Sequence, residues 1–152
     1  MKKTTAHKQK RYTADPMAMF RVIRLTKTYA EHEVVKLSLP SRLAFEAIKS
    51  GGGVLDHFNE LAVCINSAKV RSEAIDPLCA ATCRAAQDAM TRTRNRYLST
   101  GKFGFDGPAM QQIPDALDLH EEILRGSSPG LMTAALMEQY RRIDRDKNRS
   151  MA

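Results

Sequence analysis

The chain has 152 residues, enough for one domain, and its hydrophobic share of 43% and charged share of 27% are ordinary for a globular protein. Trp is absent and aromatic residues make up only 6%, so the core must consist largely of Ala, Leu, Ile and Met, which favours packed helices over a β-sandwich. The formal net charge is +7, and no apolar run approaches the ~18 residues of a membrane span. A membrane protein is therefore not expected.

Cationic residues dominate the first eleven positions, which contain no acid: Lys2, Lys3, Lys8, Lys10 and Arg11. Taking these five charges from the total leaves +2 for the remainder of the chain. The stretch has no apolar face to bury, so the sequence predicts a disordered, flexible basic arm over residues 1–13. Such an arm favours a polyanionic partner, and these five residues are candidates for binding the phosphates of nucleic acid.

The first ordered elements are expected after this arm. Asp15-Pro16 has the chemistry of a helix start and predicts a short helix over about 16–25. Residues 34–39 alternate between apolar and other positions, which indicates an extended segment, although a helical turn fits six residues as well. Pro40 biases Leu39 away from helix, so the next helix is expected from about residue 41 to Gly51-Gly52-Gly53.

Four longer helices are expected over about 54–71, 77–100, 108–125 and 129–145. Asp76-Pro77 and Ser128-Pro129 supply helix starts, and Gly101 supplies a stop. The predicted buried stripes of the last three helices are Cys79, Cys83, Ala86, Met90, Thr93 and Tyr97; Met110, Ile113, Leu117, His120 and Leu124; and Met132, Leu136, Tyr140 and Ile143. The sequence thus predicts an all-α fold, a compact bundle of five to six helices in one domain over 14–146, with a frayed tail over 147–152.

Charge is unevenly divided between two of these helices. Residues 84–102 carry five cations and one acid, whereas residues 106–125 carry five acids and one cation. Antiparallel packing of the two helices would let these charges neutralise each other. The alternative is that Arg92 and Arg96, one helical turn apart, form a phosphate-binding stripe.

The layout of residues 34–70 is similar to the ribbon–helix–helix family: an alternating segment, a short helix, a glycine turn and a longer helix. In that family the strands of a dimer enter the major groove of DNA. The resemblance implies that Lys36 and Ser38 read bases. The Gly51-Gly52-Gly53 turn and Val34 on the reading face depart from the family pattern.

Residue types that often carry catalysis or bind metals are present but do not form a motif. Cys79 and Cys83 lie on an apolar stripe and, with Cys64, are expected to be structural thiols, with no metal or cofactor. His120 is expected to be a buried, hydrogen-bonded histidine. Ser127-Ser128 is expected to cap a helix. No catalytic motif is present, so the sequence predicts that the protein is not an enzyme.

Five short motifs resemble those of small helical proteins carried by bacterial plasmids and phages, some of them labelled Fis-type regulators. These motifs are Lys10-Arg11-Tyr12, Asp15-Pro16-Met17, the helix containing Asn66, Gly101-Lys102-Phe103 and Leu119-His120-Glu121-Glu122-Ile123. The resemblance spans residues 10–143 and implies a mobile-element origin, but no activity and no functional residues. The acids of the last helix argue against a Fis-type DNA-binding C-terminus.

Together these observations predict a cytoplasmic, non-enzymatic regulatory protein that associates with DNA through its basic arm. Three cysteines without a paired spacing, and no apolar stretch after the basic N-terminus, support the cytoplasmic location. Two other functions stay open: a module that binds and modulates a host protein, and an assembly component of a larger particle. The oligomeric state also stays open, and a dimer is compatible with each function.

Overall fold

The computed structural model describes residues 26–151 and contains, within them, five α-helices and no strand. The helices are α2 (Glu31–Lys49), α3 (Leu55–Ser72), α4 (Pro77–Thr100), α5 (Ala109–Arg125) and α6 (Pro129–Ser150). The all-α prediction is confirmed. The expected basic arm and the expected helix near 16–25 lie outside the described residues.

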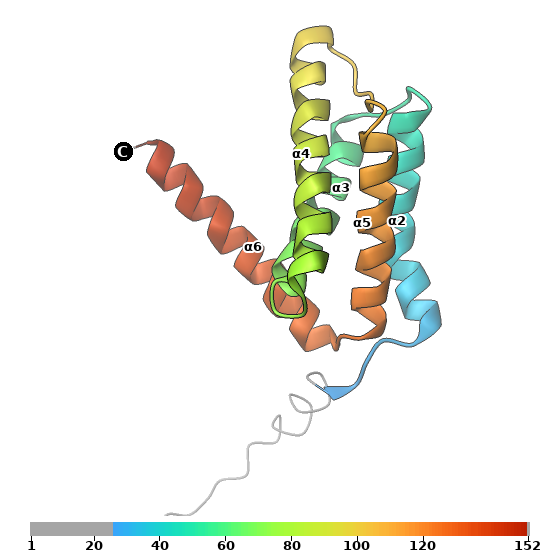
Figure 1. Cartoon of the computed structure of the whole chain (residues 1–152), viewed down its shortest axis with the longest axis vertical. Coiled ribbons are helices and arrows are strands. Elements are labelled where there is room, and N and C mark those ends of the chain that lie inside the picture. The colour runs from blue at the N-terminus through green and yellow to red at the C-terminus, as the bar shows by residue number, and fades with distance from the viewer. Residues whose placement is uncertain (1–25, 152) are drawn as a thin grey trace, which may run out of the picture.

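Helices α2 to α5 run alternately up and down beside one another, joined by short connections (Figure 1). Helix α3 packs against each of the other four described helices, so it is the centre of the fold. The main core lies between α2, α3, α4 and α5 and includes Phe45, Leu61, Ile65 and Leu117. None of the helices in this region is both long and apolar enough to cross a membrane.

Helix α6 begins against the bundle and then leaves it at an angle, so its C-terminal end stands apart from the other helices (Figure 1). Its buried residues are Met132, Ala135 and Gln139, all in the first half of the helix. Met132 of the expected stripe is buried, but Tyr140 and Ile143 are exposed, and the buried face of α6 includes Gln139 in place of Tyr140. The tail was expected to fray from residue 147, but α6 continues to Ser150.

The predicted strand over 34–39 is wrong, because these residues lie within α2. The buried face of α2 includes Val34, Ser38, Ser41 and Phe45, which recur at helical spacing. The alternation instead grouped Val35, Leu37 and Leu39, which are all exposed. The ribbon–helix–helix hypothesis, with Lys36 and Ser38 as base readers, is excluded, since Ser38 is buried in a helix.

Pro40 does not end the preceding helix, contrary to the expectation. It lies inside α2 on an exposed position, where water can bond the Lys36 carbonyl that a proline leaves without an N–H donor. The hydroxyl of Ser41 donates to the Ser38 carbonyl at 2.9 Å, so the buried serine is satisfied within its own helix.

The other helix boundaries agree with the predicted capping residues. The Asp76 carboxylate accepts from the Leu78 backbone N–H at 2.6 Å, and α4 ends at Gly101 in the left-handed conformation with φ of 72°. The Ser128 hydroxyl accepts from Leu131 N–H at 3.3 Å at the start of α6. The predicted capping role of Ser128 is therefore confirmed.

Two aromatic residues of the loop between α4 and α5 close one end of the bundle. The Phe103 ring stacks on Tyr97 and Phe58, with centroid distances of 4.0 and 5.3 Å, and Phe105 stacks on Phe45 at 5.1 Å. This turn-rich segment is therefore fixed to α2, α3 and α4.

Gly53 provides a test of how tightly α2 joins α3. A Cβ atom on Gly53 would lie 2.5 Å from Ile48 Cγ1 and 2.8 Å from Ile48 Cα. We expect Gly53→Ala to lower the free energy of unfolding by about 1–3 kcal/mol, measured by urea denaturation, because the backbone of α2 must move. The matched control is Gly52→Ala, whose Cβ would meet nothing closer than 3.7 Å and should leave stability nearly unchanged. Equal losses in both variants would contradict the close packing.

Candidate functional site

The described part of the predicted phosphate-binding set consists of Arg92 and Arg96 on α4; Lys2, Lys3, Lys8, Lys10 and Arg11 lie outside the described residues. Arg92 Nε donates to Asp106 Oδ2 at 2.6 Å, and its Nη2 donates to Gln112 Oε1 at 3.0 Å. Arg96 Nη1 donates to the Phe105 carbonyl at 3.2 Å. Both arginines thus hold the loop that follows α4, and a phosphate at Arg92 would have to compete with Asp106.

Asp106 has two roles at this point. Its other carboxylate oxygen accepts from the Ala109 backbone N–H at 2.8 Å, where it caps the start of α5. The Arg92 hydrogen bond, followed by this backbone bond, holds the pKa of Asp106 below its ordinary value. Of the predicted neutralisation between the basic stretch 84–102 and the acidic stretch 106–125, this one pair is observed, and its acid lies in the loop before α5.

Most acids of α5 instead pair with cations of α2 and of α5 itself. Arg42 on α2 binds both Asp118 and Glu121, with Nε 2.9 Å from Glu121 Oε1. At the other end of α5, Arg125 reaches Glu31 of α2 with Nη2 2.8 Å from Oε1. Since these pairs join residues far apart in the sequence, they fix α5 against α2. Among the described residues, no cation of α4 forms a salt bridge with an acid of α5.

The three thiols behave as packing residues. Cys64 and Cys83 are buried and Cys79 is partly buried. Burial raises the pKa of Cys64 to about 12, and burial also raises the pKa of Cys83. Within residues 26–151, no three His, Cys, Asp or Glu side chains gather where they could hold a metal ion. High pKa values make both thiols poor nucleophiles.

His120 is buried on α5, as the apolar stripe predicted, but the expected hydrogen bond is missing at Nδ1, which has no partner among the described residues. Burial lowers the pKa of His120 to about 4, with Arg42 adding to the effect and Glu121 opposing it. Glu121 and Glu122 bind Arg42 and Arg125 and do not form a catalytic pair with the imidazole.

Ser127 and Ser128 are both buried and hydrogen-bonded. Arg71 Nε donates to the Ser127 hydroxyl at 3.1 Å, which ties the end of α3 to the turn before α6. The Ser128 hydroxyl caps α6, so both hydroxyls accept hydrogen bonds that hold this turn. The chemistry of this turn is structural.

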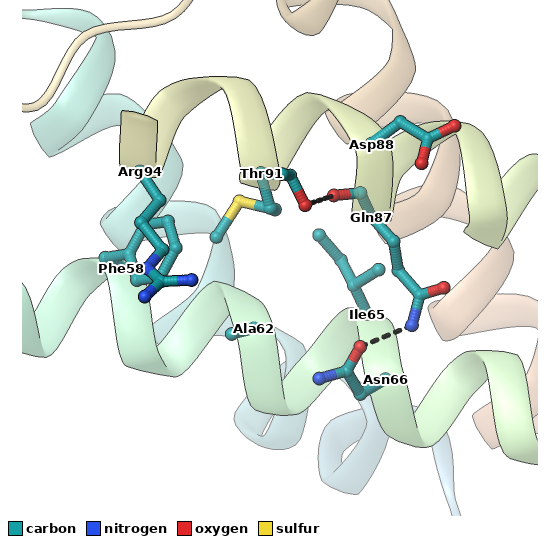
Figure 2. A pocket seen from close by; sticks show the side chains of 9 residues that line it. Phe58, Ala62, Ile65, Asn66, Gln87, Asp88, Thr91 and Arg94 are labelled. Carbon is teal, nitrogen blue, oxygen red and sulfur yellow. Dashed lines mark hydrogen bonds between the residues drawn. The ribbon is translucent and has the colours of Figure 1, made fainter. Parts of the chain in front are cut away.

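An open polar groove between α3 and α4 was not recognised from the sequence (Figure 2). It has a volume of about 410 Å³, and at its floor Gln87 Nε2 donates to Asn66 Oδ1 at 2.6 Å. Arg94 lies toward one end with Phe58, and Asp88 lies toward the other (Figure 2). The two amides are joined by this hydrogen bond, so the groove offers polar contacts from α3 and α4.

The outward face of α2 carries an apolar stripe that the sequence analysis also missed. Val35, Leu39 and Leu43 recur every four residues and are 53%, 50% and 60% exposed. Within residues 26–151 no element packs over this stripe. The four-residue spacing of these apolar side chains could have indicated the stripe, but the alternation of residues 34–39 was interpreted as a strand instead.

A second, more apolar groove of about 260 Å³ lies between α2, α3, α5 and α6. Its lining residues are Tyr29, Leu37, Glu60, Val63, Cys64, Ser67, His120, Leu124, Met132, Thr133 and Leu136. The residues nearest the core, including Leu124 and His120, are buried, whereas Leu37 and Val63 on the rim are partly exposed.

Comparisons with protein-family models, curated proteins and solved structures found no match to this chain. The resemblance to plasmid and phage proteins therefore stays a prediction.

The buried His120 should make stability depend on pH. Because its pKa is near 4 in the folded protein and 6.5 when unfolded, the unfolded state binds more protons as pH falls below about 6.5. We expect the free energy of unfolding to drop by about 2 kcal/mol between pH 7 and pH 5, measured by urea denaturation.

His120→Leu is the matched variant, since it removes the titrating group and fills the same buried position with an apolar side chain. In His120→Leu, the free energy of unfolding should change little between pH 7 and pH 5. This window lies above the pH range where the paired carboxylates titrate. An unchanged slope in His120→Leu would show that another group causes the pH dependence.

Proposed function

We propose that the protein is a non-enzymatic, DNA-associated protein whose N-terminal segment contacts phosphates. The observation that carries this proposal is the separation of charge along the chain. Residues 26–151 contain seventeen Lys and Arg against sixteen Asp and Glu, a formal net charge of +1, so residues 1–25 carry +6 of the total +7. Excess positive charge is the feature that attracts a polyanion.

Ion pairs within the bundle support this assignment. Eight of the described cations are paired with acids, namely Arg42, Lys49, Lys69, Arg92, Arg125, Arg141, Arg142 and Arg145. A phosphate would have to displace a carboxylate at each of them. The cations of residues 2–11 have no acid within the first fourteen positions of the sequence.

The test is binding of labelled duplex DNA by fluorescence anisotropy at about 50 and 200 mM salt. Five phosphate contacts give a log–log salt slope near −4.5, which is roughly a 500-fold loss of affinity over this range. We expect that slope for the intact chain, and loss of most of it when Lys2, Lys3, Lys8, Lys10 and Arg11 are all replaced by Gln.

The matched control replaces Arg92 and Arg96 by Gln in the intact chain. If these arginines also contacted phosphates, the slope would fall by about 1.8. We expect a smaller change, since both guanidinium groups are engaged by the loop after α4. Absence of binding at 50 mM salt would refute the nucleic-acid proposal.

The apolar stripe on α2 favours a second candidate function, docking of a protein partner. Three large aliphatic side chains aligned on the outer face of one helix resemble the anchors that a helix presents at a protein interface. Such binding would bury apolar area and depend little on salt.

A charge placed on the stripe tests this second function. Leu43→Glu should abolish binding of any partner that docks there and leave the free energy of unfolding within about 0.5 kcal/mol, because Leu43 is 60% exposed. The control is Leu98→Glu on α4, which is 68% exposed and lies off the stripe. The measurement compares the proteins from the native host that co-purify with each variant. A partner that co-purifies with both variants would contradict docking on α2.

A further inference from the structure

The apolar groove between α2, α3, α5 and α6 has the character of a docking site. Its floor is built from buried side chains, and its rim carries Leu37, which is 45% exposed, with Val63 and Leu136 nearby. One acid, Glu60, stands exposed at this rim, and no salt bridge within residues 26–151 involves it.

Chain connectivity leaves one apolar segment within reach of this groove. Tyr29 lines the groove and packs against the buried cluster that contains Val34 and Met132. Leu25 precedes Tyr29 by four residues, so even a fully extended chain keeps it within about 14 Å. Residues 17–25 contain six large apolar side chains: Met17, Met19, Phe20, Val22, Ile23 and Leu25.

We propose that residues 17–25 of the same chain occupy this groove. Exposed together, six large apolar side chains would be unfavourable in water, and the groove is an apolar surface within reach. Charge is also complementary, because the segment contains Arg21 and Arg24 and no acid, while the rim of the groove offers Glu60.

The α2 stripe is a poorer site for this segment. Val35, Leu39 and Leu43 lie on the side of α2 opposite its buried face, whereas Tyr29 enters on the side of the buried cluster. Docking in the groove would fix the point at which residues 1–16 leave the bundle. This inference does not depend on DNA binding, since it concerns a different segment of the chain.

Site-specific photo-crosslinking in the intact chain tests the proposal. Phe20 is replaced by the photoreactive p-benzoylphenylalanine, the protein is irradiated, and crosslinked peptides are identified by mass spectrometry. We expect crosslinks within single molecules to groove residues of α2, α3 or α6, with Met132 and Leu136 among the targets. The same probe at Tyr12, ahead of the apolar segment, should give none of them.

Two leucines of α2 supply matched variants. Leu37→Glu puts a charge on the groove rim and should abolish the Phe20 crosslinks, whereas Leu39→Glu, at a similarly exposed position outside the groove, should keep them. Cooperative thermal unfolding of both variants confirms that each is folded. Crosslinks to the α2 stripe, crosslinks only between two molecules, or no crosslinks would each overturn the proposal.

Discussion

Helix α3 sets the fold, because all four other described helices pack on it. A helix surrounded in this way must let its neighbours come close, and α3 does so with small residues, including Ser67, Ala68 and Ser72, all buried. The two hydroxyls are not left unsatisfied, since Ser67 donates to Cys64 O at 3.0 Å and Ser72 to Lys69 O at 2.8 Å. Close packing on α3 is therefore compatible with polar residues in the interior.

The same use of buried serine explains where sequence reasoning succeeded and failed. Both ends of α4 and the start of α6 were predictable because Asp76, Gly101 and Ser128 mark them by local chemistry. The half of α2 before Pro40 was not predictable in this way, since its buried face includes Ser38, and a pattern based on apolar residues alone assigns that position to solvent. Exposure of Tyr140 was also unpredictable, because it depends on which face of α6 turns to the bundle, and that face includes Gln139.

The candidate sites divide in a similar way. The complementary charge of residues 84–102 and 106–125 was visible in the sequence, but its one ion pair, Arg92 with Asp106, joins α4 to the loop that follows it and not to α5. Pairing of Arg42 with Glu121 joins positions 79 apart, so it follows only from the arrangement of the helices in space. Both grooves are likewise formed by residues from several helices, and no local spacing indicates them.

Salt can separate folding from binding in this protein because the two rest on different interactions. The fold depends on a core of buried apolar side chains such as Leu61 and Ile65, whose transfer from water is insensitive to ionic strength in the range of 50–200 mM. Most of the bundle's ion pairs include one exposed side chain, and pairs of that kind contribute little to stability. A loss of DNA affinity over that range would therefore report on phosphate contacts and not on unfolding of the helices.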